Sequence, residues 1–401
     1  MNCAELFVKC LEKEKVEYIF GIPGEENLDM MDALLDTKLR FVLVRHEQGA
    51  AFMADVYGRL TGRAGVCLST LGPGASNLVT GVADANMDRA PVVAITGQAS
   101  LDRMHKESHQ YMDVVGMFKP ITKWNTMLRH KDAITESVRK AFKVAEAESP
   151  GATHLDFPED LAESKADSAA RILDPEEKFV VPHCTDDSLK RAAALINKAK
   201  NPLILSGNGT IRCNASKQLR GLVARTNIHV AETFMGKGCV PYTDNRSLLT
   251  IGLQAHDFVS SAFDRADVVI AIGYDMVEYH PYLWNGTCNK KIVHIGANTA
   301  EVDGCYRVDV EVVGDISNAL ERLTPLISPR DDVKLFQAVR ENILTEISRH
   351  GDDQGFPVKP QRILSDVRKA MKPDDILISD VGAHKMWIAR MFPCIEPNTN
   401  I

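Results

Sequence analysis

Short apolar runs alternate with stretches of helical spacing along the first part of the chain. Apolar runs at 41–44, 65–69 and 91–95 predict strands, and the stretches between them predict helices. Because successive positions of each run are apolar, both faces of these strands must be covered, as in a parallel sheet between two layers of helices. Residues 1–165 are therefore expected to form one α/β domain.

The same alternation returns after a polar stretch. Residues 166–187 have no clean hydrophobic period and are expected to be a linker between domains. Apolar runs at 201–207, 266–273 and 291–295 then predict further strands separated by helices. We therefore expect a second parallel-sheet α/β domain over 188–328.

The last part of the chain has too little pattern for a domain of its own. A charged helical connector is expected at 329–356. Residues 357–401 follow with a helix, one strand at 375–379 and a second helix. A segment with a single strand cannot bury an independent core. The sequence thus predicts two consecutive α/β domains and the start of a third, and it favours a chain that is truncated at its C-terminus.

Charge and composition argue against several classes of partner. The 401 residues include 54 acidic and 47 basic side chains, which leaves a net charge of −7 and predicts no basic face for nucleic acid. No apolar run approaches the ~18 residues of a membrane helix, and acidic residues stand too early for a signal peptide. A cytoplasmic protein is expected. Its nine cysteines, scattered without a CxxC pair, are then expected to be reduced thiols.

Candidate functional residues follow several of the predicted strands. Glu47 stands between a strand end and a helix start, where side chains at the end of a parallel strand face a ligand crevice. An acid that complements the helix dipole would stand at the same position, so the spacing leaves both interpretations open. The loops Gly21–Gly24 and Gly72–Gly74 and the pair His109-Gln110 are further candidates, although each could be a plain turn or a structural polar group.

Several common catalytic motifs are missing from the sequence. It has no HExxH zinc motif, P-loop or GxSxG elbow, and no metal-ligand constellation stands out. Gly207-Asn208-Gly209 follows a predicted strand but lacks the third glycine of a dinucleotide fingerprint. Spacing alone thus indicates a multidomain α/β enzyme or binding protein with a cleft at strand ends.

The motifs in combination are more specific than any one of them. Four segments stand in order in the first domain: GIPG (21–24), RHEQGAAFMADVYGR (45–59), STLGPGASNLVTG (69–81) and PVVAITGQ (91–98). Together they resemble the pyrimidine-binding domain of thiamine-diphosphate enzymes, and most closely that of the acetolactate synthase family. Residues 190–325 are similar to this family's middle, Rossmann-like domain, and SDVGAHKMWIAR (379–390) resembles the opening of its diphosphate-binding domain.

Two further segments resemble the catabolic branch of the family, which binds no flavin. SHQYMDVVGMFKPITKW (108–124) places His109 where flavin-binding relatives usually carry Phe. IGYDMVEYHPYLWN (272–285) stands where the flavin-dependent branch has an Arg-Phe-Asp-Asp-Arg type stretch. The resemblance therefore implies that FAD is not bound. Glu25-Glu26 departs from the family, whose members have small or differently charged residues there, and this leaves the acceptor substrate open.

The resemblance implies thiamine diphosphate as the cofactor and assigns residues to it. Glu47 would hydrogen-bond the aminopyrimidine ring and activate the cofactor, and Gly24 would lie on the loop beside the same site. Gln110 and His109 would face the reacting carbons as catalytic hydrogen-bond partners. The diphosphate cradle would begin with Val381, Gly382, Ala383 and His384.

The resemblance also implies a Mg²⁺ ion that anchors the diphosphate. The family's Gly-Asp-Gly stretch for this ion has no match in the sequence, so the metal-binding motif is expected beyond Ile401 and no metal ligand is assigned. The cofactor would lie between the first domain of one subunit and the diphosphate domain of another, in a homodimer or a dimer of dimers.

The implied reaction joins two pyruvates to 2-acetolactate with release of CO₂. This chain alone is expected to be inactive. One alternative is another thiamine-diphosphate 2-keto-acid decarboxylase or carboligase, and the other is a non-catalytic short subunit.

Overall fold

The chain folds as two units, each built around one six-stranded sheet. The computed structural model describes residues 1–167, 170–175, 181–253, 257–331 and 334–401. The first unit is Met1–Phe179 and the second is Val180–Ile401. The expected linker over 166–187 and connector over 329–356 lie partly outside the described residues.

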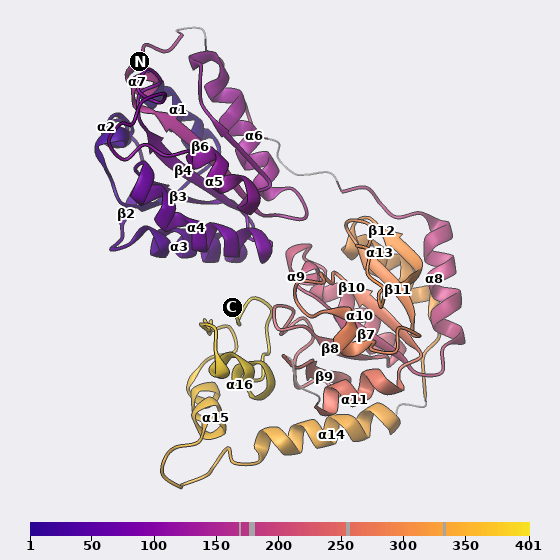
Figure 1. Cartoon of the computed structure of the whole chain (residues 1–401). Coiled ribbons are helices and arrows are strands. Elements are labelled where there is room, and N and C mark those ends of the chain that lie inside the picture. Colours follow the sequence, from indigo (N-terminus) through magenta and orange to yellow (C-terminus); the bar gives the residue numbers. More distant parts are fainter. Residues whose placement is uncertain (168–169, 176–180, 254–256, 332–333) are drawn as a thin grey trace. The chain divides into compact units, whose positions relative to one another are not determined.

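The first unit contains a parallel sheet in the order β2-β1-β3-β4-β6-β5. Figure 1 shows this sheet with β2, β3, β4 and β6 labelled. Its strands are β1 (Tyr18–Gly21), β2 (Arg40–Leu43), β3 (Gly65–Ser69), β4 (Val92–Gln98), β5 (Trp124–Met127) and β6 (Ala152–Pro158). Its α-helices are α1 (Cys3–Lys13), α2 (Leu28–Leu34), α3 (Glu47–Thr61), α4 (Gly72–Met87), α5 (Val114–Phe118), α6 (Ile134–Glu146) and α7 (Glu159–Glu163). Short 3₁₀ turns are η1 (Glu25–Asn27), η2 (Lys119–Ile121) and η3 (Lys131–Ala133).

Helices cover both faces of this first sheet. One core joins the sheet to α1, α2, α6 and α7, and a second core joins its other face to α3, α4 and α5. Every residue of β3 and β4 is buried, which is why these strands are apolar at successive positions. The α/β architecture predicted for the first domain is confirmed.

The second unit is also a parallel sheet, in the order β12-β11-β10-β7-β8-β9. Its strands are β7 (Pro202–Ser206), β8 (His229–Glu232), β9 (Ser247–Thr250), β10 (Val268–Ile272), β11 (Lys291–Gly296) and β12 (Val308–Val313). The helices that surround it are α8 (Asp186–Lys198), α9 (Gly209–Arg212), α10 (Ser216–Thr226), α11 (Phe258–Arg265), α12 (Pro281–Trp284), α13 (Ile316–Leu323), η4 (Thr324–Leu326) and α14 (Lys334–Ser348). Counted along the chain, the strand order is that of the doubly wound Rossmann fold, so the Rossmann-like prediction is confirmed.

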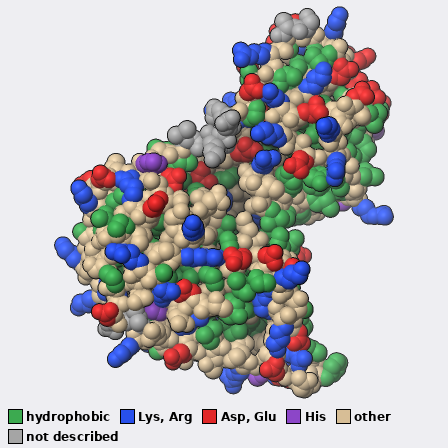
Figure 2. Space-filling view, turned by 180° about the vertical axis from the view of Figure 1, so that it is seen from behind, with side chains coloured by type: hydrophobic (Ala, Val, Ile, Leu, Met, Phe, Trp, Pro, Cys, Tyr) green, Lys and Arg blue, Asp and Glu red, His purple; other side chains and the backbone are tan. Residues whose placement is uncertain are grey.

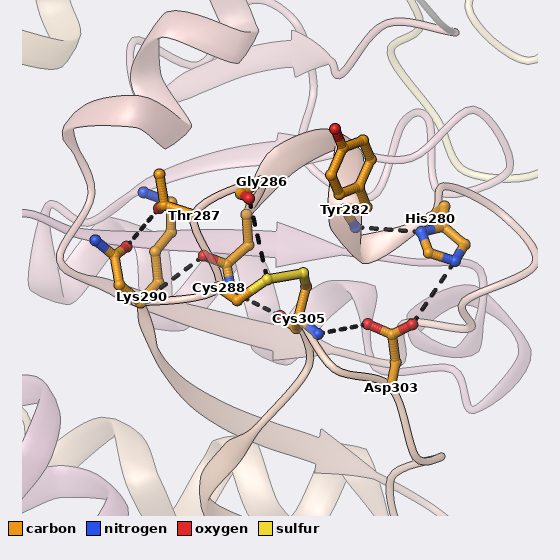
Figure 3. The surroundings of a disulfide bond; sticks show 10 residues. His280, Tyr282, Gly286, Thr287, Cys288, Lys290, Asp303 and Cys305 are labelled. Atoms are coloured by element: carbon orange, nitrogen blue, oxygen red, sulfur yellow. Dashed lines mark hydrogen bonds and ion pairs between the residues drawn. A yellow bond between two sulfur atoms is a disulfide. The ribbon is translucent and has the colours of Figure 1, made fainter.

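Cys288 and Cys305 form a disulfide, so the expectation of reduced thiols throughout is wrong (Figure 3). Each of the two precedes one of two neighbouring parallel strands, Cys288 before β11 and Cys305 before β12. Parallel pairing therefore brings both cysteines to the same edge of the sheet, with their Cα atoms 4.2 Å apart. Asn285 supports the same approach, because its side-chain amide donates to the carbonyl of Cys305 at 2.6 Å.

The last segment packs on the second unit rather than forming a strand. It consists of α15 (Pro360–Ala370) and α16 (Ala383–Met391), whose apolar side chains share a core with Phe234. The strand expected at 375–379 is wrong, because the structure has only an isolated bridge between Leu377 and Asn400. An apolar run becomes a strand only where a neighbouring strand pairs along it, and here the pairing is limited to this bridge.

Basic and acidic side chains are interspersed on the face of the molecule that Figure 2 shows. That face therefore carries mixed charge rather than one basic patch. Among the described residues, none of the helices is long and apolar enough to cross a membrane.

A buried lysine attaches α16 to the second sheet. The Lys237 ammonium donates to the carbonyls of Ile388, Ala389 and Phe392, at 3.0, 2.9 and 2.8 Å, at the C-terminal end of the helix. These carbonyls belong to the last turn of a helix, where such groups lack intrahelical partners. A positive charge is also favourable at this end of the helix dipole.

We predict that Lys237→Met lowers the free energy of unfolding of the second unit by about 3 kcal/mol, because it leaves buried carbonyls without a donor. Urea unfolding followed by tryptophan fluorescence measures this, since Trp387 lies on α16 itself. Lys198→Met is the control, because Lys198 is exposed on α8 and its replacement is expected to change little. Equal midpoints for the two variants would contradict the role of Lys237.

Candidate active site

Glu47 lies at the first position of α3, at the carboxyl edge of the first sheet, and only 8% of it is exposed. Its Oε2 accepts a hydrogen bond from the side-chain amide of Asn77 on α4 at 2.9 Å. Gly74 lies beside the other carboxylate oxygen, since a β-carbon there would stand 3.4 Å from Oε1. The helix N-terminus and the Asn77 amide both favour a negative charge at this position.

Gly24 and Glu26 approach the same edge from the loop after β1. A β-carbon at Gly24 would lie only 2.5 Å from the side chain of Thr70, so this loop touches the loop after β3 only because residue 24 is glycine. The Thr70 hydroxyl donates to Glu26 Oε2 at 2.5 Å, and its methyl group faces Gly74. Thr70 therefore joins the Gly24 loop to the surroundings of Glu47.

Gln110 reaches the site through its main chain. Gly72 has a φ of +47°, and a β-carbon on it would overlap the carbonyl oxygen of Gln110. Gln110 itself has a φ of +56°, so the loop turns sharply where it meets α4. The side chains of Gln110 and its neighbour His109 are exposed. The structure thus places Glu47, Gly24 and Gln110 at one edge of the sheet, linked through the 70–74 turn.

Val381, Gly382, Ala383 and His384 lie in the second unit, at the start of α16. Gly382 caps this helix with a φ of +151°. Val381 is exposed, and its N–H donates to Asp380 Oδ1 at 2.6 Å. The first N–H groups of a helix can bind an anion such as a diphosphate, which is the role assigned to this segment by resemblance.

Two polar residues of the site, Asn77 and Thr70, were not singled out from the sequence. Both stand inside the segment 69–81 that carries the resemblance, but their types are common in turns and helix starts. Only the packing of α4 beside α3 shows that Asn77 faces Glu47. A signal was present for Glu26, because its acidic type departs from the family pattern.

The second sheet has its own ligand position at the strand-order reversal between β7 and β10, and a side chain occupies it. Glu278 accepts the N–H of Asn208 at 3.1 Å, the N–H of Asp275 at 3.2 Å and the hydroxyl of Thr233. Burial raises the pKa of Glu278 to about 7. This carboxylate lies against Gly207, in the turn that holds nucleotide phosphates in dinucleotide-binding proteins.

The part of the chain that the structure describes contains no candidate metal site. No three His, Cys, Asp or Glu side chains in these ranges come together as ligands for an ion.

Two family models match the chain, one in each unit. The model described as "Thiamine pyrophosphate enzyme, N-terminal TPP binding domain" matches residues 1–117. The model described as "Thiamine pyrophosphate enzyme, central domain" matches residues 189–323. The matched segments thus contain the whole second sheet, strands β1 to β4 of the first sheet, and Glu47.

Curated relatives match almost the whole chain. A "Probable acetolactate synthase large subunit" of Methanocaldococcus jannaschii is 36% identical over 429 residues, which cover 100% of this chain and 70% of the relative. An "Acetolactate synthase" of Bacillus subtilis is 34% identical over 99% of this chain and 70% of its own length. An "Acetolactate synthase, catabolic" of Raoultella terrigena is 35% identical over 96% of this chain and 70% of its own length.

We predict opposite effects for two glycine-to-alanine substitutions in this unit. Gly72→Ala adds a β-carbon that overlaps Gln110 at a positive φ, and should lower the free energy of unfolding by about 1–3 kcal/mol. Gly49→Ala, on α3, meets no atom within 4 Å and should raise it by about 0.5–1 kcal/mol, because alanine favours a helix. Thermal unfolding of both variants checks the pair, and a stable Gly72→Ala would disprove the close approach.

Proposed function

The chain belongs to the acetolactate synthase family of thiamine-diphosphate enzymes, and on this premise we propose that it joins two pyruvates to 2-acetolactate with release of CO₂. The observation that carries the proposal is the buried carboxylate of Glu47, held by Asn77 in a glycine-lined edge of the first sheet. This carboxylate fits the aminopyrimidine half of the cofactor, since it is a buried hydrogen-bond acceptor at a helix start, and Gly74 beside its Oε1 carries no side chain.

In the proposed reaction, the residues of the first unit bind and orient the reactants. Bound thiamine diphosphate supplies a carbon nucleophile and absorbs the charge left after decarboxylation. Glu47 hydrogen-bonds the pyrimidine ring and holds a proton there, and burial strengthens this bond by excluding water. Gln110 and His109 are proposed to face the reacting carbons and to hydrogen-bond the oxygen atoms of the substrate, because their loop touches the 70–74 turn.

We propose that the diphosphate binds the main chain at Val381, Gly382 and Ala383, with His384 beside it. The support is the helix start at Gly382, which offers backbone N–H groups to an anion. Mg²⁺ is proposed to accompany the diphosphate, because a hard divalent cation neutralises phosphate oxygens. The described residues do not fit a metal site, so we assign no ligand and derive no step through the ion.

The relatives are matched over 70% of their length, and we propose that residues 1–401 by themselves are inactive. A homodimer or dimer of dimers is proposed for the active enzyme. Apolar side chains on α3 and α4 support this, because Met53 is 46% exposed, Leu60 38% and Met87 60%. Light scattering and pyruvate assays on residues 1–401, beside the protein from its complete reading frame, test both proposals.

Product analysis tests the reaction. The protein from its complete reading frame is incubated with pyruvate, thiamine diphosphate and Mg²⁺, and the products are separated by chromatography. 2-Acetolactate with CO₂ is expected. Acetaldehyde alone would support the alternative decarboxylase, and cofactor binding without turnover would support the non-catalytic subunit.

We predict that Glu47→Gln slows exchange of the thiazolium proton of the cofactor by ~10²–10⁴, in line with the loss of an acid–base group. Quenched-flow NMR of the bound cofactor in deuterated water measures the rate. Glu136→Gln is the matched control, because Glu136 is exposed on α6 and its loss should leave the rate unchanged. A rate that Glu47→Gln does not alter would rule out the assigned role.

We predict that the purified enzyme is colourless and needs no added FAD. Glu278 supports this, since its carboxylate already takes the N–H groups at the turn where a dinucleotide phosphate would bind. The absorption spectrum from 350 to 500 nm and activity with and without FAD check the prediction. A flavin spectrum at one equivalent per chain would contradict it.

A further inference from the structure

A chain of buried polar side chains runs through the first sheet below the candidate site. Asp156, on β6, is completely buried, and its Oδ1 accepts the hydroxyl of Thr96 at 2.6 Å. Its Oδ2 accepts the side-chain amide of Gln98 at 3.1 Å. Both donors lie on β4, the strand that pairs with β6. Each oxygen of this buried carboxylate therefore accepts a hydrogen bond from a side chain of the neighbouring strand.

Gln98 connects this carboxylate to both ends of the loop that carries His109 and Gln110. Its Oε1 accepts the N–H of Ala99 at 2.9 Å, at the start of the loop. Its Nε2 lies 3.4 Å from the carbonyl of Met112, at the end of the loop. One buried amide thus contacts both ends of the segment 99–112, and the orientation of that amide is set by Asp156.

We propose that ionised Asp156, acting through Gln98, positions the loop 99–112, and that protonation of Asp156 loosens this loop. Asp156 and Gln98 are then positioning residues for His109 and Gln110 rather than catalytic residues. The catalytic meaning of the tether rests on the proposed function. The existence of the tether does not rest on the proposed function, because the tether consists of contacts within the first unit alone.

The ionised and protonated states of Asp156 differ in the proton positions along the hydrogen bonds that join Asp156, Thr96 and His154. When Asp156 is ionised, the single Thr96 proton goes to the carboxylate, so His154 Nε2, at 2.8 Å, must donate to Thr96 Oγ1. When Asp156 is protonated and donates to Thr96, the Thr96 hydroxyl turns to His154 Nε2, and the single proton of the neutral ring must then move from Nε2 to Nδ1. Gln98 then faces a neutral acceptor, and a hydrogen bond to a neutral acceptor is weaker than one to a carboxylate.

The surroundings favour titration of Asp156 in the accessible pH range. Burial and, to a smaller extent, the nearby Asp113 carboxylate raise the pKa of Asp156, the hydrogen bonds from Thr96 and Gln98 lower it, and the net value is about 6. Burial lowers the pKa of His154 to about 3, so this ring stays neutral above pH 5.

Other charged groups stand at the elements packed against this pair of strands. Glu26 on η1 lies over Gly97, and Phe118 of α5 stacks on the His154 ring. On α7, Glu159 pairs with Arg103, and Asp160 accepts the N–H of Leu101.

Because the pKa of Asp156 is raised, the order of the loop 99–112 and the free energy of unfolding of the chain respond to pH in opposite directions. The folded chain binds the Asp156 proton more tightly than the unfolded chain does, so protonation adds to the stability of the fold as pH falls from 7 toward 4. Over the same range the loop loses its charged acceptor. Loosening of 99–112 below pH 6 is therefore not a consequence of general unfolding.

Hydrogen exchange on the 401-residue chain, without cofactor, tests the tether. The reporters are Val114, whose N–H donates to Met112 at 2.8 Å, and Tyr111, whose N–H donates to Ser108 at 3.3 Å. Protection factors, corrected for intrinsic exchange, should fall roughly fivefold from pH 7.5 to pH 5, with a midpoint near the pKa of about 6. Protection that does not change over this range would overturn the proposal.

Two variants separate the tether from other causes. Asp156→Asn can reproduce the neutral pattern, donating to Thr96 and accepting from Gln98, so protection should be low and independent of pH while the thermal midpoint does not fall. In Gln98→Met, the methionine side chain has a similar volume to glutamine but no hydrogen-bond donor. Protection in this variant should also be low and independent of pH. Asp132→Asn, with a side chain 62% exposed on η3, should behave like the unchanged chain.

Two outcomes would disprove the inference. A pH-dependent profile that persists in Asp156→Asn would show that Asp156 is not the group that controls the loop. Full protection in Gln98→Met would show that Gln98 does not hold the loop, whether or not Asp156→Asn folds. A failed acetolactate assay would leave both results unaffected.

Discussion

Buried carboxylates at or just beyond the carboxyl ends of parallel strands hold the loops on which both units depend. Asp156 acts on the 99–112 loop through Gln98. Glu232, the last residue of β8, accepts two backbone N–H groups from the loop 233–240 at 2.7 and 3.2 Å. Glu278 joins the turns after β7 and β10 in the same way. Hydrogen bonds to a charged acceptor are strong, so one side chain fixes a loop that has little core of its own.

The two proposed parts of the cofactor site, the start of α16 in the second unit and Glu47 in the first, both depend on loops at strand ends. In the second unit, the loop that Glu232 holds also bears Lys237, and Lys237 binds the C-terminal end of α16. The start of α16 is the proposed diphosphate cradle, so its position depends on the far end of the same helix. In the first unit, Gly24 and Gly72 allow loops to touch where any side chain would separate them. Beside these loops, Glu47 is buried and keeps one side-chain donor, the amide of Asn77.

The sequence patterns predicted the sheets well because fully buried strands leave a direct record in apolar runs, as β3 and β4 show. The position of Glu47 at a strand end followed from the same pattern. Contacts between distant segments left no such record. The disulfide of Cys288 with Cys305 depends on the pairing of β11 with β12, and β12 alternates exposed and buried residues instead of forming an apolar run.

The anchoring carboxylates lower the stability of the fold at neutral pH. Burial raises the pKa of Glu232 and of Glu278 from 4.5 to about 7, and that of Asp156 from 3.8 to about 6. The folded chain then binds these protons more tightly than the unfolded chain, so their contribution to stability is greatest at low pH and falls as pH rises through 6 and 7.

For a shift of this size the loss is on the order of 3 kcal/mol per group. The loops are best held when the same groups are ionised. We therefore expect order at the strand ends and stability of the fold to change in opposite directions across pH 6–7.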